Sequence, residues 1–186
     1  QGRAGAMLTG VWSGGCAGVL GAGASGYRDP LRGVSGLVAE RIDQGVDYSG
    51  TGPIYPLGPG VVLDTAGPGW PGGTYIAYRL SAGPAAGKVA YVAEDLRPRV
   101  HVGQSVTTST VLGVMYAGPD GIETGWGNPS GVPQAAGASQ WGERSGSTGS
   151  TAYGVNFDRL LVSLGAPSGI LHPPVRGLLP PGWPRW

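Results

Sequence analysis

Glycine and proline interrupt nearly every apolar run in this chain, and this punctuation limits what the chain can fold into. The 186 residues include 38 glycines and 17 prolines, residues that end helices and strands and form tight turns. Because 40% of the residues are hydrophobic and fall in short, spaced runs, the pattern indicates many short strands joined by turns, not a disordered chain. We therefore expect an all-β domain, an antiparallel sandwich or barrel.

Charge and cysteine content exclude several classes of protein. Only 12% of the residues are charged, the net charge is +1, and no basic patch supports nucleic-acid binding. A surface poor in charge suits an extracellular protein or a large assembly. The lone Cys16 excludes an intrachain disulfide and a cysteine zinc site. No apolar run approaches the roughly 20 residues that span a bilayer, so no transmembrane segment is expected.

Changes in composition divide the chain into five segments. They are a Gly/Ala-rich N-terminal arm (1–36), a β domain (37–127), a Gly/Ser-rich loop (128–152), a short helix (153–166) and a Pro/Trp tail (167–186). Within the β domain, residues 37–41 fit either a short helix or an extended segment. Gly45 to Tyr48 reads as a strand that ends at the Gly/Pro-rich residues 49–53.

The short helix is predicted from an apolar face with matching end signals. Asn156 is the expected N-cap, and Gly165 is placed to end the helix. Apolar side chains recur at helical spacing between them, namely Phe157, Leu160, Leu161 and Leu164.

Six short motifs follow one another between Arg41 and Trp126. They are Asp43-Gln44-Gly45-Val46-Asp47, Gly60-Val61-Val62, Tyr75-Ile76-Ala77-Tyr78, Tyr91-Val92-Ala93-Glu94-Asp95-Leu96, Val102-Gly103-Gln104-Ser105-Val106 and Gly121-Ile122-Glu123-Thr124-Gly125-Trp126. Their order and spacing resemble those of the lysostaphin-like peptidoglycan endopeptidases, in which the first motif reads His-x-Gly-x-Asp and the last reads His-x-His. The resemblance covers about half of the chain. It implies a lysostaphin-like β-sandwich with duplicated hybrid motifs, in a degenerate form seen in actinobacterial phage and envelope proteins.

The resemblance also implies a metal site that this chain has altered. In the family, two His and one Asp hold Zn²⁺ and leave a position open for the water that attacks the substrate. Here Asp43 stands at the first ligand position, and Asp47 matches the second. Two alignments of the last strand stay open, with the two His replaced by Glu123 and Gly125 or by Ile122 and Thr124, which lie on opposite faces of a strand.

The remaining histidines do not restore the site. A further catalytic His of the family is replaced by Glu94 or Asp95. The chain's two histidines, His101 and His172, lie away from the motif positions. The zinc ligands are therefore largely absent, so we expect no zinc, no cofactor and no endopeptidase activity of the family's kind.

Carboxylates could still form a different centre. Asp43, Asp47 and Glu123 are ligands for a harder ion, and a cluster of them would bind Ca²⁺, Mg²⁺ or Mn²⁺ weakly. The competing interpretation is that each carboxylate is solvated separately or bonded to backbone N–H groups. Glu94 and Asp95 with Glu123 are also candidate catalytic carboxylates, of the paired kind that glycoside hydrolysis uses.

Aromatic residues are the candidates for a binding groove. Trp70, Tyr75, Tyr78 and Trp126 could stack on sugar rings or on a Pro/Gly-rich peptide. Packing in the core is the competing explanation for all of them.

These observations predict a non-catalytic, endopeptidase-like module outside the cytoplasm. We expect a structural or cell-wall-binding component of a phage tail, virion or bacterial envelope, with peptidoglycan or other subunits as partners. One alternative is a peptidoglycan hydrolase with a remodelled metal or carboxylate centre. Another is a filament or coat subunit that assembles with copies of itself.

Overall fold

The described part of the chain is mostly β-structure, which confirms the all-β expectation. The structure is a computed structural model that describes residues 26–67, 69–129, 131–141 and 149–186. Its strands are β1 (Ser35–Ile42), β2 (Val46–Ile54), β3 (Gly60–Asp64), β4 (Tyr75–Leu80), β5 (Val89–Glu94), β6 (Leu96–Pro98), β7 (Ser105–Val106), β8 (Gly113–Met115), β9 (Ile122–Gly127) and β10 (Ile170–Leu171). Its helices are the 3₁₀ turn η1 (Pro71–Gly73), α1 (Gln134–Gly137) and α2 (Ala152–Leu164).

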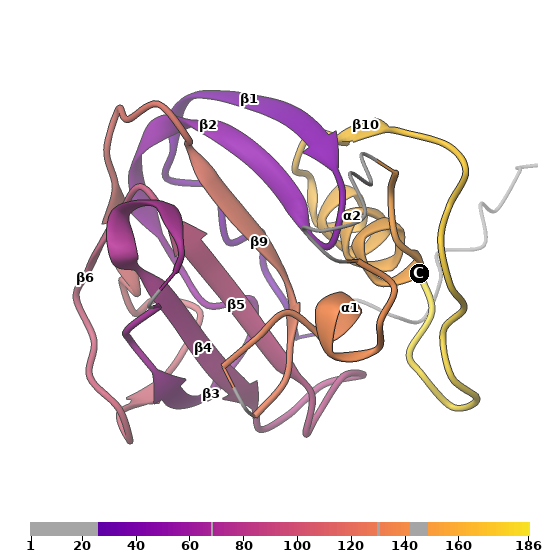
Figure 1. Cartoon of the computed structure of the whole chain (residues 1–186). Coiled ribbons are helices and arrows are strands. Elements are labelled where there is room, and N and C mark those ends of the chain that lie inside the picture. Colours follow the sequence, from indigo (N-terminus) through magenta and orange to yellow (C-terminus); the bar gives the residue numbers. More distant parts are fainter. Residues whose placement is uncertain (1–25, 68, 130, 142–148) are drawn as a thin grey trace, which may run out of the picture.

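The strands form one curled sheet in the order β10-β1-β2-β9-β5-β4-β3-β7. All neighbours along this path are antiparallel except β1 and β10, which are parallel. The strand β8 pairs with both β2 and β6 at the side. Figure 1 shows β1 and β2 arching over the sheet, with α2 and the yellow C-terminal tail on the side opposite β6.

The strand β2 is longer than the sequence indicates. Residues 49–53 were expected to end it, but it continues to Ile54. Gly50 and Gly52 both adopt a positive φ, and a Cβ on Gly52 would lie 2.5 Å from the carbonyl oxygen of Gly33. These glycines let the strand leave β1 and β9 and pair with β8, so the residues expected to stop the strand bend it instead.

The central strands β4 and β5 are buried on both faces. Even-numbered side chains point into the main core and odd-numbered ones form a second cluster, as the two-residue period of a strand requires. The main-core members are Ile76, Tyr78, Leu80, Ala90 and Val92. The second cluster contains Tyr75, Ala77, Val89, Tyr91 and Ala93, with Leu63 and Trp70 packed against it.

The helix α2 has the predicted apolar face and end but begins earlier than expected. Gly165 adopts a left-handed φ of 108° at its C-cap. Its N-cap is Thr151, whose hydroxyl accepts a hydrogen bond from Gly154 N at 3.0 Å, so the expectation of Asn156 at this position is wrong. Asn156 is buried within the helix, where its Oδ1 accepts from Trp126 Nε1 at 2.9 Å.

Two segments expected to lie outside the domain pack onto it. Tyr27 and Leu31, from the last part of the predicted arm, are buried in the main core. Residues 1–25 of that arm, including Cys16, lie outside the described residues. At the other end, Trp183 and Trp186 of the tail pack on the buried Trp126, with ring centroids 5.9 Å and 5.8 Å away. Among the described residues, no helix is long and apolar enough to cross a membrane.

We expect Gly154→Ala to destabilise the protein although alanine favours helices. Gly154 lies in the first turn of α2, where a Cβ would overlap the carbonyl oxygen of Asp43 in the β1–β2 turn. The helix propensity gain of about 1 kcal/mol is then outweighed by a displacement of the helix costing roughly 1–3 kcal/mol. Urea denaturation followed by circular dichroism measures the change.

The control for this prediction is Val162→Ala, at an exposed position of the same helix. It should leave the free energy of unfolding within about 0.5 kcal/mol of the wild type. A Gly154→Ala protein as stable as the control would contradict the tight docking of α2 on the turn.

Candidate functional site

Three carboxyl groups from distant parts of the sequence meet on one face of the sheet. Asp47 on β2 is paired with Glu123 on β9, and Asp43 lies in the turn before β2. Each of the three offers an oxygen within 4.8 Å of the others. The side of β9 that carries Glu123 therefore faces Asp43 and Asp47, whereas Ile122 belongs to the main core. Of the two candidate pairs on this strand, Glu123 and Gly125 therefore share the face that meets Asp43 and Asp47.

Asp43 and Glu123, but not Asp47, line a hollow of about 380 Å³, which we call the acidic groove. Its walls come from the η1 loop, from α1 with the two residues before it, and from Trp141 just after α1. The lining residues are Arg41, Asp43, Gln44, Gly69, Trp70, Pro71, Glu94, Glu123, Val132, Pro133, Ala136 and Trp141.

Arg41 supplies the positive charge of the acidic groove. Its Nε donates to Asp47 Oδ2 at 2.5 Å, and a terminal nitrogen lies 3.3 Å from Asp43 Oδ2. The Asp43 and Asp47 side chains are almost fully buried, but the Arg41 side chain is 58% exposed. One guanidinium therefore offsets part of the charge of two buried carboxylates from the solvent side, which lowers the cost of burying them.

Glu123 is held by neutral partners. The Tyr91 hydroxyl donates to Glu123 Oε1, and Gln44 Nε2 donates to Glu123 Oε2 at 3.4 Å. Burial, together with the charges of Asp43 and Asp47, raises the pKa of Glu123 well above its usual range. The environment of Glu123 therefore favours its protonated form more than water does, which lowers the repulsion within the cluster.

Two further carboxyl groups of the site have raised pKa values. Burial and the neighbouring charge of Asp43 raise the pKa of Asp47 to about 7. Burial and the charge of Asp47 raise the pKa of Glu94 to about 8. Glu94 also adopts a φ of 82°, a conformation that costs a non-glycine residue energy and is often found at functional sites.

Tight backbone packing leaves no room for a side chain at Gly125. A Cβ there would lie 2.9 Å from Gly45 Cα and 3.0 Å from the Tyr91 ring, and a Cβ on Gly45 would lie 2.5 Å from the carbonyl oxygen of Thr124. The ring of Tyr91 thus fills the space beside Glu123. An imidazole at position 125 would require Tyr91 or the β1–β2 turn to move.

Other predicted site residues lie elsewhere. Tyr78 and Trp126 are buried in the main core, and Tyr75 is buried in the second cluster, where it stacks between Trp70 and Tyr91. Asp95 does not line the groove, because its Oδ2 accepts from the backbone N–H groups of residues 120 and 121. Core packing or turn formation accounts for these residues, and Trp70 is the predicted aromatic that reaches the acidic groove.

Three polar or aromatic residues of the acidic groove were not predicted. Arg41 and Gln44 flank Asp43 in the sequence, but pairing across the β1–β2 turn is needed to place them. Trp141 had a usable signal, because it is a lone large aromatic residue in a loop of small and polar ones.

The chemistry of the groove follows from its donor set. His101 and His172 are exposed and do not line it, so its described residues offer oxygen ligands and no imidazole. Zinc of the family's kind does not fit this set. A hard cation does, because Ca²⁺ and Mg²⁺ prefer carboxylate and amide oxygens. Protonated carboxyl groups such as Glu94 and Glu123 are also suited to act as general acids.

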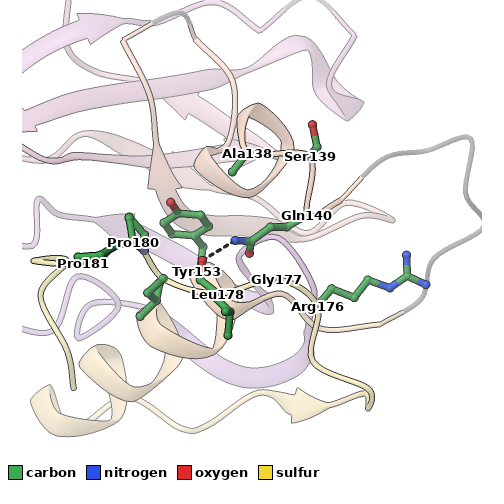
Figure 2. A pocket seen from close by; sticks show the side chains of 10 residues that line it. Ala138, Ser139, Gln140, Tyr153, Arg176, Gly177, Leu178, Pro180 and Pro181 are labelled. Carbon is green, nitrogen blue, oxygen red and sulfur yellow. Dashed lines mark hydrogen bonds between the residues drawn. The ribbon is translucent and has the colours of Figure 1, made fainter.

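A second hollow lies between α1, the start of α2 and the tail. It measures about 610 Å³, and the side chains of Gln140, Tyr153 and Arg176 line it together with residues 177–181 (Figure 2). Gln140 Nε2 donates to the Leu178 carbonyl at 2.9 Å and so fastens the tail to the segment after α1. No acidic residue is among its lining residues, which sets it apart from the acidic groove.

Compared with protein-family models, with curated proteins and with solved structures, the chain matches none of them. We therefore infer its function from the groove's own residues.

We expect the protein to be more stable in mild acid than in mild base. In the unfolded chain Asp47 and Glu94 ionise near pH 4, whereas in the folded protein they keep their protons up to a pKa of about 7 and about 8. Between these values the folded state binds more protons, so the free energy of unfolding falls as the pH rises. Thermal melts should therefore give a higher Tm at about pH 5 than at about pH 8.

Glu94→Gln should reduce this fall in Tm, because the amide has no proton to lose. Glu40→Gln is the matched control, since Glu40 is exposed, does not line the groove and makes the smallest of the contributions that raise the pKa of Asp47, so it should change the slope less than Glu94→Gln does. A Tm that is constant or rises between about pH 5 and pH 8 would show that the buried carboxyl groups ionise normally.

Proposed function

We propose that this chain is a non-catalytic module with a lysostaphin-like fold that binds its ligand in the acidic groove. The ligand is a cell-wall peptide or a segment of another subunit, and the module belongs to a phage tail, virion or bacterial envelope assembly. The finer fold assignment is part of this proposal. It is supported by the pairing of Asp47 with Glu123, which brings together the positions where the family places its metal ligands.

One observation carries the proposal: the groove keeps carboxyl groups and aromatic walls, but its described lining residues include no imidazole. Without imidazole ligands, the groove lacks the groups that hold the family's zinc ion and its attacking water. In addition, the Arg41 guanidinium forms ion pairs with both Asp43 and Asp47, at oxygens that a metal ion would otherwise bind. These features favour recognition over hydrolysis.

The test combines metal analysis, a hydrolysis assay and a pull-down on peptidoglycan. We expect no stoichiometric zinc and no release of cell-wall peptides, together with retention on peptidoglycan. Trp70→Ala should weaken that retention about tenfold by removing an aromatic wall. Val102→Ala changes an exposed residue outside the groove and should bind like the wild type. Turnover that is lost on chelation would overturn the non-catalytic assignment.

A second candidate is a hydrolase with a remodelled centre. Two observations favour it: the clustered oxygens of Asp43, Asp47 and Glu123 suit Ca²⁺, Mg²⁺ or Mn²⁺, and Glu94 lies in the same groove as a potential proton donor. When bound, such a cation would polarise a carbonyl group of the substrate. The residues of the chain would hold the cation and supply the proton to the leaving group.

Glu123→Gln tests this candidate. It removes an ionisable carboxyl group from the oxygen cluster and keeps an acceptor for the Tyr91 hydroxyl, so the fold should survive. If the centre is catalytic, cell-wall lysis should fall by a factor of about 100 or more, whereas Glu40→Gln should leave it unchanged. Equal lysis by Glu123→Gln and wild type would exclude a catalytic role for this residue.

A further inference from the structure

A lining residue of the acidic groove carries a buried acceptor atom that lacks a donor. Gln44 Oε1 has no hydrogen-bond partner within the described part of the chain. Gln44 is more than nine-tenths buried, with 4% of its surface exposed. An unpaired buried acceptor costs roughly 1–3 kcal/mol. A ligand that satisfies this atom must therefore donate a hydrogen bond or be a cation.

The groove is rich in acidic groups, which favours a cationic ligand. Asp43, Glu94 and Glu123 line it, and Arg41 is the single basic residue among its described lining residues. Burial raises the pKa values of Glu94 and Glu123, and a cation bound beside them would lower these pKa values and favour the ionised forms. Because the Arg41 side chain is 58% exposed, it can swing into solvent without leaving a buried cation behind. A positively charged ligand can then take its place on the carboxylates.

The walls of the groove indicate that this cation has an organic stem. Trp70 and Trp141 line the groove together with Val132, Pro71 and Pro133, so much of its surface is apolar. Indole rings attract ammonium groups over their faces and pack against methylene groups. A bare metal ion would use the carboxylates and leave most of the 380 Å³ hollow and its aromatic walls without a contact.

We propose that the acidic groove binds a primary alkylammonium group, with its three N–H donors on the Asp43, Gln44 and Glu123 oxygens and its stem between Trp70 and Trp141. Two sources share this chemistry, a lysine-like side chain and the free N-terminus of a peptide. The inference rests on the proposed function, because it names the ligand class of the same groove.

Calorimetric titration of the full chain in calcium-free buffer at neutral pH tests the inference. The probes are Nα-acetyl-lysine amide, triglycine amide and the uncharged Nα-acetyl-norleucine amide. We expect at least one amine to bind about tenfold or more tighter than the norleucine derivative, a difference of about 1.4 kcal/mol. The tighter of the two amines identifies the source. Equal binding of the three probes, or no binding of either amine, would overturn the inference.

Variants of the two tryptophans separate an ammonium site from a metal site. Trp141→Ala should weaken binding of the preferred amine several-fold by removing a cation–π and stem contact. Trp141→Leu keeps an apolar wall in case the alanine variant folds poorly, and it should also bind the amine more weakly. Binding of Ca²⁺ by the wild type without binding of amine, or unchanged amine affinity in both folded variants, would contradict the proposal.

Peptidoglycan with its free amines acetylated distinguishes this inference from the proposed function. Loss of retention on the acetylated wall supports both. Retention on the acetylated wall supports the cell-wall role and overturns ammonium recognition. Amine binding in solution without retention on any wall supports ammonium recognition and overturns the cell-wall role.

Discussion

The burial of three carboxyl groups within 4.8 Å of one another is the constraint on which the rest of the site depends. Like charges at this separation repel strongly in a medium that excludes water. The protein lowers the cost in two ways: the Arg41 guanidinium offsets part of the charge of Asp43 and Asp47, and burial beside the Tyr91 hydroxyl raises the pKa of Glu123. The same arrangement leaves the buried Gln44 Oε1 of the groove without a donor.

The position of Glu123 depends on a sheet that is buried on both faces. The alternation of β4 and β5 places Tyr75 and Tyr91 on the groove side, where they stack with centroids 5.1 Å apart and continue to Trp70 at 5.6 Å. This stack fixes the Tyr91 hydroxyl against Glu123. Glycine at positions 45 and 125 lets the β1–β2 turn, the strand β9 and the Tyr91 ring approach closely. The packing that orients Glu123 therefore also leaves no room at position 125 for a metal-binding side chain such as histidine.

The position of Asp43 depends on the helix that follows the loop. The Asp43 carbonyl oxygen accepts from both the backbone N–H and the hydroxyl of Thr151, at 2.9 Å and 2.8 Å. The residue that caps α2 therefore also fixes the turn that carries a groove carboxylate. Trp126 and Asn156 link the same helix to the sheet and to the tail. A groove on one face of the sheet is thus held by elements from the whole described chain.

The sequence by itself determined the β-rich class, the apolar face and Gly165 end of α2, and Asp43, Asp47 and Glu123 as candidate ligands of one cluster. The first two follow from local rules, because glycine and proline punctuate strands and apolar side chains repeat with the helical period. The three carboxylates came from the order of motifs that resembles the endopeptidase family. Only the tertiary structure decided which face of β9 meets Asp47. It also decided that Tyr75, Tyr78 and Trp126 pack in the interior, and that Thr151 rather than Asn156 caps the helix. It alone placed Arg41, Gln44 and Trp141 around the carboxyl groups, because these contacts depend on strand pairing and loop docking between residues far apart in the sequence.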